Sequence, residues 1–142
     1  MPDILHRVGI GVRPNRVFEA LTTIGGLRGW WIAGAIGDPR PGGEIDFGFC
    51  QMLVLDAVPN ERVHWRCVSG PEEWVFTEVI FDLSWKEDQT IVLFKHAKWK
   101  NPVEFMHHCS TKWATFLLSL RDQLERAAGH PAPRDVKIAV ND

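Results

Sequence analysis

The stretch from residue 101 to residue 129 constrains the fold most, because it predicts one long amphipathic helix. Apolar residues recur in it at steps of three and four, which puts them on one stripe. The stripe consists of Met106, Cys109, Trp113, Phe116, Leu117, Leu120 and Leu124. Asn101 and Pro102 predict its first turn, and Gly129 followed by two prolines predicts its end. Burying such a stripe gains on the order of 10 kcal/mol gross, so the rest of the chain must supply a large apolar partner.

Size and charge restrict the class of protein. The chain of 142 residues has room for one domain, which we expect to span residues 1–133, with residues 134–142 as a C-terminal tail. The net charge is −2 and the basic residues do not cluster, which argues against nucleic acid as a partner. No apolar run approaches the ~20 residues of a membrane span, and the N-terminus lacks the apolar core of a signal peptide. We therefore expect a cytoplasmic protein without membrane insertion.

The region before the long helix alternates like a series of strands. A first strand is predicted within residues 3–12, followed by a short helix that Pro14 opens and a second one through residues 24–31. Further strand candidates are residues 43–49, 51–58, 62–68, 74–85 and 90–99. Short connections make consecutive strands antiparallel. We predict an α+β fold in which a curved antiparallel sheet of about six strands wraps around the long C-terminal helix.

Several motifs, in this order, resemble those of the START-related helix-grip (SRPBCC) superfamily. They are PNRVFEALTT followed by WW, PGG before a charged strand, VPNERVHW between two strands, and FKHAKW followed by the helical run FLLSLRDQLE. The sequence is most similar to the branch named after the activator of heat-shock protein 90 ATPase, over roughly residues 3–133. The resemblance implies a hydrophobic cavity between sheet and helix. It implies little about chemistry, because the superfamily includes lipid carriers, hormone receptors, polyketide cyclases and chaperone activators.

The resemblance also implies which side chains look toward the cavity. They are Trp31, Phe47, Trp65, Phe94, His96, Trp113, Phe116 and Leu117. The orientation of Phe81, Leu83 and Trp85 stays open, because their strand is apolar on both faces. Trp30 and Trp31 are adjacent, and we expect that they do not both point inward, which would leave one indole at a rim.

His96 is the polar residue of most interest in this set. An unshifted imidazole titrates near neutrality, so His96 could hydrogen-bond a ligand or act as a general base. The alternative is a buried neutral histidine paired with the backbone or with the long helix. We favour the alternative, because buried polar groups are usually paired structurally.

The sequence carries no strong signature of a catalytic centre, a metal site or a cofactor. His107 and His108 are adjacent, and neighbouring helical positions diverge by about 100°, which disfavours a shared metal. Glu44 and Asp46 share a strand face that we expect to be solvated, and the three cysteines are too widely spaced for a disulfide framework or zinc finger. No nucleophile motif, phosphate loop or HExxH occurs. We predict no catalytic residues, no metal and no cofactor.

Three functions follow from these observations. Binding of a small hydrophobic or aromatic ligand in the cavity ranks first, because aromatic walls favour it. A cyclase- or hydrolase-like enzyme needs several converging polar groups, and only His96 is offered, so we favour a role without catalysis. A chaperone-interacting domain is suggested by the name of the branch. A homodimer stays open as well, because exposed sheet edges can pair.

Overall fold

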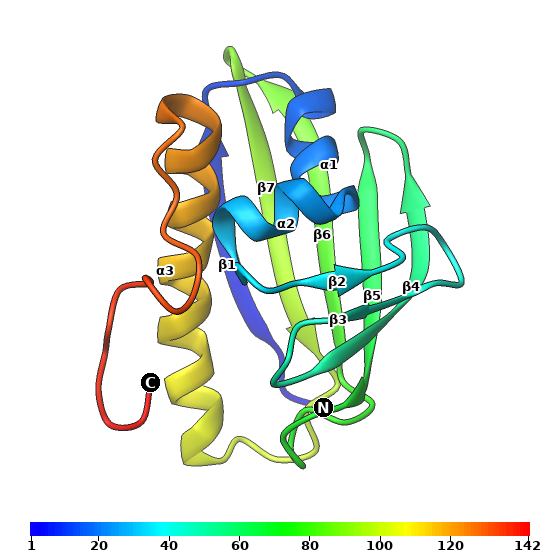
Figure 1. Ribbon diagram of the computed structural model, residues 1–142, viewed down its shortest axis with the longest axis vertical. Helices are drawn as coiled ribbons and strands as arrows, with labels where there is room; N and C mark the ends of the chain where they lie inside the picture. The colour runs from blue at the N-terminus through cyan, green and yellow to red at the C-terminus, as the bar shows by residue number, and fades with distance from the viewer.

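A curved antiparallel sheet and a long helix packed across one of its faces dominate the computed structural model, which describes residues 1–142 (Figure 1). The strands are β1 (Ile4–Ile10), β2 (Ile36–Gly37), β3 (Glu44–Asp46), β4 (Gln51–Val58), β5 (Arg62–Ser69), β6 (Glu78–Lys86) and β7 (Gln89–Ala97). The helices are α1 (Pro14–Thr22), α2 (Ile24–Trp30) and α3 (Glu104–Arg126). The sheet order is β1-β7-β6-β5-β4-β3-β2. The predicted helix-grip fold is confirmed, with the two-residue β2 as a seventh strand.

Alternation along the strands determines which side chains face the helices. Val63, Trp65 and Cys67 of β5 are fully buried, whereas His64 and Arg66 lie on the opposite, partly exposed face. The same alternation in β6 buries Val79, Phe81 and Leu83 and leaves Trp85 40% exposed near the hairpin. Phe81 and Leu83 therefore belong to the core, and Trp85 does not.

The predicted bounds of the long helix are wrong at both ends. Residues 101–103 form a separate turn, closed by a hydrogen bond from the N–H of Val103 to the carbonyl of Asn101 (2.9 Å), so that α3 begins at Glu104. At the other end Ala127 adopts a left-handed conformation (φ 54°), and its N–H bonds back to Gln123 (3.0 Å). Gly129 serves a different purpose, because a Cβ there would lie 2.2 Å from the carbonyl oxygen of Gly29.

The predicted strand 74–85 is too long at its N-terminal end, because residues before Glu78 form turns. The N–H of Trp74 bonds to the carbonyl of Pro71 and that of Thr77 to Trp74, both at 2.9 Å. Phe76 adopts a left-handed conformation (φ 72°), which turns its ring out to 68% exposure while Trp74 stays buried. The alternating apolar pattern resembles a strand here, but the backbone folds on itself.

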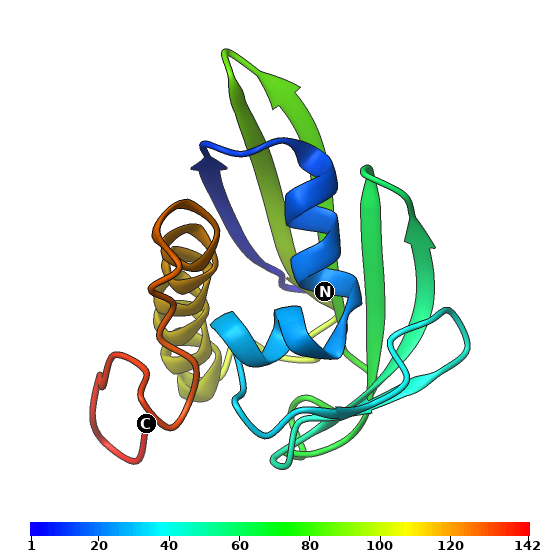
Figure 2. The ribbon, with the colours of Figure 1, turned by 45° about the horizontal axis from the view of Figure 1, so that its top comes forward.

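Both tryptophans at the end of α2 point inward, which corrects the expectation for Trp30 and Trp31. Figure 2 shows α1 and α2 lying on the same side of the sheet as α3. Trp30 packs against Phe81 at 6.2 Å and donates its indole N–H to the carbonyl of Ala20 (3.0 Å). Trp31 stacks on Trp30 (5.9 Å, 20°) and packs against Phe47 at 4.2 Å. The two rings are 0% and 2% exposed, so neither indole is left at a rim.

The C-terminal segment runs back along α3 and ends beside the N-terminal half of that helix (Figures 1 and 2). Its first part is fixed to the body by backbone hydrogen bonds from Ala33 to Ala132 (3.0 Å) and from Ala132 to Trp31 (2.7 Å). The structure contains no helix that combines the length and the apolar character needed to cross a bilayer.

On the outer face of the sheet, one carboxylate gathers three basic side chains. Glu78, 4% exposed, accepts hydrogen bonds from His64 (2.6 Å), Arg66 (3.2 Å) and Lys98 (2.9 Å). Burial by itself would raise the pKa of this carboxyl, but the hydrogen bonds from Lys98, His64 and Arg66 outweigh it and lower the pKa from 4.5 to about 2. The cluster ties β5, β6 and the end of β7 together.

We expect Glu78→Gln to lower the free energy of unfolding by on the order of 2 kcal/mol at pH 7, a value that allows for screening around the exposed Arg66 and Lys98. The folded-state pKa is depressed, so this stabilisation is fully present above pH 4.5 and is lost as the pH falls toward about 2. Urea denaturation between pH 3 and pH 7 measures both effects. The matched control is Asp82→Asn on the same strand, whose 3.2 Å ion pair with Arg62 is exposed, and it should cost less than about 1 kcal/mol. Equal losses in both variants would contradict the assignment.

Candidate ligand-binding site

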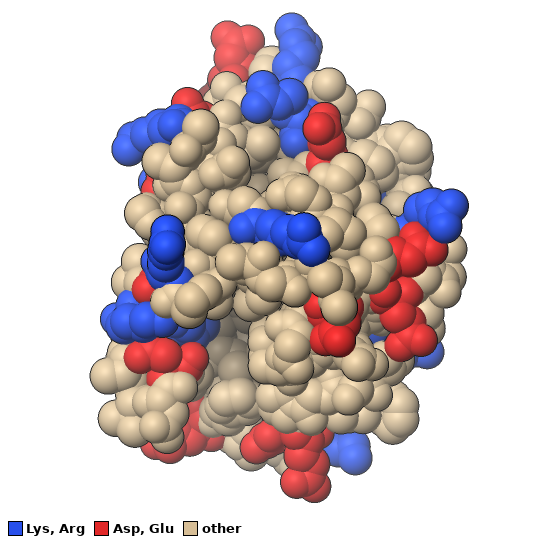
Figure 3. Space-filling view, viewed as in Figure 1, with Lys and Arg blue, Asp and Glu red and all other residues tan.

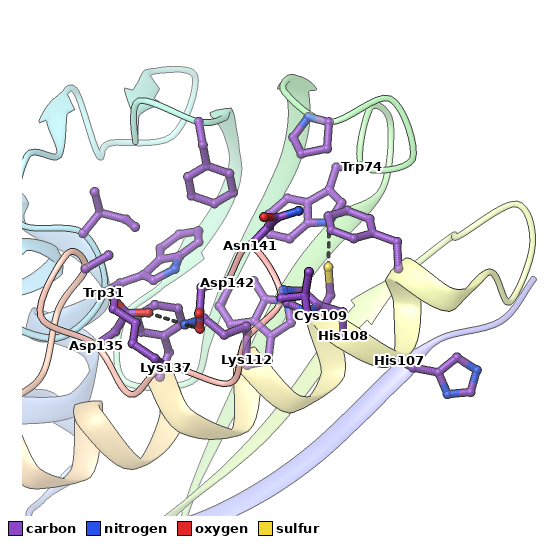
Figure 4. Close-up of a pocket in the computed structure, with 18 of the residues that line it drawn as sticks. Trp31, Trp74, His107, His108, Cys109, Lys112, Asp135, Lys137, Asn141 and Asp142 are labelled. Carbon is purple, nitrogen blue, oxygen red and sulfur yellow. Dashed lines mark hydrogen bonds and ion pairs between the residues drawn. The ribbon is translucent and has the colours of Figure 1, made fainter.

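An open pocket with a volume of about 1090 Å³ lies beside the N-terminal half of α3. Its other sides are the turn before β6, the residues that follow α2, and the C-terminal segment. Figure 3 shows the surface hollowed in the lower half of this face, and Figure 4 shows the side chains around the pocket. With Phe49, which precedes β4, five segments far apart in the sequence thus meet at one site.

Aromatic rings form the inner wall of the pocket. Trp113 of α3 lies 4.9 Å from Trp31 and 6.0 Å from Trp74, with its ring nearly parallel to that of Trp74 (13°). Phe49 packs edge-on against Trp74 at 5.3 Å and is 45% exposed, and Phe116 completes the wall one turn along α3. Such a surface offers flat faces and edges to an apolar or aromatic molecule.

The outer side of the pocket is polar and comes largely from the C-terminal segment (Figure 4). The ammonium of Lys112 on α3 forms ion pairs with Asp135 and with Asp142 (3.3 Å to the latter), and it donates to the carbonyl of Val136 (3.0 Å). Lys137 also binds Asp135, at 2.8 Å. Burial alone would raise the pKa of Asp135, but the hydrogen bonds from Lys112 and Lys137 outweigh it and hold the pKa below its usual range.

Cys109 lies in the wall but is a poor nucleophile. Burial raises the pKa of its thiol to about 12, although the indole N–H of Trp74 donates to the sulfur (3.3 Å) and opposes part of that shift. At neutral pH the group is therefore a thiol, which packs as a small apolar side chain.

His96 lies behind the pocket in a fully paired network, as the favoured alternative predicted. An indole nitrogen can only donate, so Trp113 Nε1–H donates to His96 Nδ1 (3.0 Å). The Thr77 hydroxyl has one hydrogen and donates it to the carbonyl of Trp74 (2.6 Å). In its contact with His96 the Thr77 oxygen must therefore accept, so His96 Nε2 carries the proton and donates to Thr77 Oγ1 (2.8 Å). Burial lowers the pKa of His96 to about 3, and the imidazole is neutral at physiological pH.

The structure divides the eight predicted cavity residues into two groups. All are at most 7% exposed. Trp31, Trp113 and Phe116 line the pocket. Phe47, Trp65, Phe94, His96 and Leu117 lie deeper, where the rings fill the space between sheet and helix. Trp31 separates the two regions, since Trp65 stacks behind it at 5.9 Å (4°). A role for any of the eight in ligand binding stays a prediction.

Sequence reasoning missed the polar side of the pocket. Lys112 had a detectable signal, because it falls three positions after Cys109 and four before Phe116, within the apolar stripe of α3. Asp135 and Asp142 had no comparable signal in the sequence. No group of three or more His, Cys, Asp or Glu side chains is arranged to hold a metal ion.

Comparisons with known proteins agree with the resemblance drawn from the motifs. The family model described as activator of Hsp90 ATPase homolog 1-like protein matches residues 12–125. The Aha1 dimer from Colwellia psychrerythraea is 41% identical, with a TM-score of 0.83 over 91% of this chain and 100% of that chain. CalU16 from Micromonospora echinospora is 24% identical, with a TM-score of 0.75 over 92% of this chain and 77% of that chain. DynU16, a protein in the dynemicin biosynthetic locus, is 19% identical, with a TM-score of 0.72 over 89% of this chain and 48% of that chain. The last two share the fold, and no protein of curated function matches the chain.

The neutral His96 gives a stability prediction with a defined sign. Because the folded-state pKa is depressed from 6.5 to about 3, the unfolded chain takes up the proton first as the pH falls. We expect the free energy of unfolding to fall by about 1.4 kcal/mol per pH unit between pH 6 and pH 4.5 from this group alone. His96→Gln should remove that slope, and His130→Gln, at an exposed histidine, should leave it in place. Denaturation curves at three pH values between 4.5 and 6 measure the slope of the free energy of unfolding against pH. An unchanged slope in His96→Gln would rule out the neutral buried imidazole.

Proposed function

The chain belongs to the family of activator of Hsp90 ATPase homolog 1-like proteins, and on that premise we propose that it binds one small apolar or aromatic molecule in the pocket beside α3. The observation that carries the proposal is a continuous aromatic wall inside a pocket of about 1090 Å³. Drug-sized ligands occupy pockets of roughly 300 to 1,000 Å³ with mostly apolar linings and a few polar groups. The pocket lies slightly above the upper end of that range, and half of its lining residues are hydrophobic.

Trp31, Trp74 and Trp113 are the proposed main contacts. Their rings are held by neighbours on the core side and border the pocket while being at most 5% exposed, so little side-chain entropy remains to be lost on binding. The deeper predicted residues Phe47 and Trp65 then support the wall from behind through Trp31. A planar ligand would extend the existing ring contacts into the pocket.

Binding is favoured over catalysis because the reactive groups nearby are already committed. His96 is neutral, buried and hydrogen-bonded at both nitrogens, and Cys109 has a raised pKa. Lys112 is ion-paired with carboxylates. A cyclase- or hydrolase-like enzyme remains the alternative use of the same pocket. The occurrence of DynU16 in a biosynthetic locus supports a small-molecule role for this fold in either case.

A second candidate function is interaction with a chaperone, and the family description and the 41%-identical Aha1 favour it. Phe76 is the surface residue that we assign to such a role, because its ring is 68% exposed and its left-handed backbone is strained for a residue with a side chain. The test is the ATPase rate of Hsp90 with and without the purified chain. Stimulation that Phe76→Ala abolishes would favour this function over ligand binding.

Self-association is part of the same proposal. The similar protein from Colwellia psychrerythraea is described as a dimer, which supports a homodimer here. Native mass spectrometry reads the number of chains and any retained ligand in one measurement.

A cytoplasmic location is proposed as well. All three cysteines are free, as is usual for proteins of a reducing compartment.

The ligand proposal is tested with 2-naphthalenemethanol, a neutral aromatic probe, followed by tryptophan fluorescence and calorimetry. We expect one molecule per chain. Phe49→Ala should weaken its binding about fivefold, because it removes an exposed ring of the wall worth roughly 1 kcal/mol. Phe76→Ala is the matched control, since this phenylalanine is also exposed but lies outside the pocket, and the affinity of the variant should not change. No saturable binding, or an equal loss in both variants, would refute the pocket as the site.

A further inference from the structure

We propose that Lys112 is the anion-recognition residue of the pocket, and that the ligand is an apolar carboxylic acid whose carboxylate replaces Asp135 at the Lys112 ammonium. This inference rests on the proposed function and gives its ligand a chemical class. It also assigns residues 134–142 a role, as a segment that occupies the anion position until a ligand arrives.

The position of Lys112 on α3 is the first argument. It lies on the helix face that carries Cys109, Trp113 and Phe116, and its side chain is only 11% exposed. The ammonium lies 5.4 Å from the centre of the Phe116 ring. A lysine with so little water around it needs an anion, and an anion at this point lies directly beside the aromatic wall.

The second argument is how the segment 134–142 is attached. Residues up to Ala132 are held by backbone hydrogen bonds to Trp31 and Ala33. Beyond that point, every hydrogen bond or ion pair to the body of the molecule is made by the ammonium of Lys112, which donates to Asp135, Val136 and Asp142. The remaining polar contacts of Lys137, Ile138 and Ala139 stay within the C-terminal segment. Lys112 therefore makes all the polar contacts that hold residues 134–142 to the body.

The third argument is charge and shape. The docked segment presents a carboxylate to Lys112 and closes the outer side of the pocket, opposite the aromatic rings (Figure 4). An apolar molecule with a carboxylate at one end reproduces that contact and adds the ring contacts that the segment lacks. Glu104, the other fixed charge on the helix side of the pocket, lies eight positions earlier, about 12 Å along the helix axis. The Lys112 position is therefore cationic once the segment 134–142, with Asp135 and Asp142, has left it.

The exchange has a clear thermodynamic form. Asp135 competes with the ligand carboxylate for the ammonium of Lys112. The apparent affinity for the ligand is therefore reduced in proportion to the fraction of molecules in which the ammonium is free of Asp135. Removing the charge of Asp135 should therefore tighten binding of carboxylates and leave neutral ligands unaffected. Removing the charge of Lys112 should abolish the preference for carboxylates.

The experiment compares two probes of the same shape, 2-naphthoate and 2-naphthalenemethanol, on the full chain at pH 7.5 by calorimetry. The measured quantity is the ratio of the two dissociation constants. A variant that opens the pocket by releasing residues 134–142 changes access for both probes alike, and this effect cancels in the ratio. Asp135→Asn should raise the preference for naphthoate about tenfold, the size expected for one charge-assisted contact. Lys112→Met should bring the ratio close to one, and Lys112→Arg should retain the preference. Arg134→Met, which removes a charge next to Asp135 outside the pocket, is the matched control and should leave the ratio unchanged.

The outcomes separate this inference from the proposed function. If both probes bind but Asp135→Asn and Lys112→Met leave the ratio unchanged, the pocket binds ligands and the anion site is refuted. If neither probe binds any variant, both proposals fall. Circular dichroism and thermal melts verify that each variant is folded. A second readout is the backbone mobility of Ile138, measured by NMR. Addition of naphthoate should make this residue more mobile, and addition of the alcohol should not. Equal mobility with both probes would contradict the exchange.

Discussion

The hydrogen bond from Trp113 to His96 is the interaction on which the grip of α3 on the sheet depends. A buried indole N–H must be paired, and here the acceptor comes from β7. This bond fixes both the rotation of α3 and its position along the strand. The ring contacts of Trp113 with Trp31 (4.9 Å) and Phe94 (4.6 Å) follow from that position. A shift of α3 by one residue would leave the indole and the imidazole unpaired, so the core accepts a single register.

The same aromatic core explains why the pocket lies beside the middle of the grip. Sheet and helix enclose a space that large rings fill, with Trp31 packed between Phe47 and Trp113. Toward the start of α3 the helix presents Cys109 and Lys112 between the rings of Phe105 and Trp113. A thiol is small, and the lysine extends outward to its carboxylates, so the wall opens there. The cavity is the region where these two side chains interrupt the row of rings.

Local patterns made the fold accessible from the sequence, because each main element carries its own signal. The three- and four-residue spacing from Cys109 to Leu120 identifies α3, and alternation identifies β5. The turn at residues 71–77 lacks a distinguishing signal, since its apolar residues alternate as those of a strand do and only the left-handed Phe76 breaks the strand. The polar half of the pocket was out of reach for another reason. Lys112 and Asp135 are 23 positions apart, and no periodicity encodes such a contact.

Lys112 places an ammonium within the apolar stripe of α3, where its desolvation costs free energy. Such a group is stable only where an anion pairs with it. In this chain the partner belongs to residues 134–142 and not to a neighbouring strand, and the polar contacts of these residues with the body all go through Lys112, so core and partner can part without unfolding. Two of the three large apolar side chains of that segment contribute little to keep it docked, because Val136 and Val140 are 53% and 80% exposed, and only Ile138 is partly buried. Docking therefore depends on a small difference in free energy between the Lys112 ammonium paired with a carboxylate and the same ammonium hydrated by water. One flank of α3 is thus locked by Trp113 and His96, while the other is closed by a contact that a competing anion of modest affinity can displace.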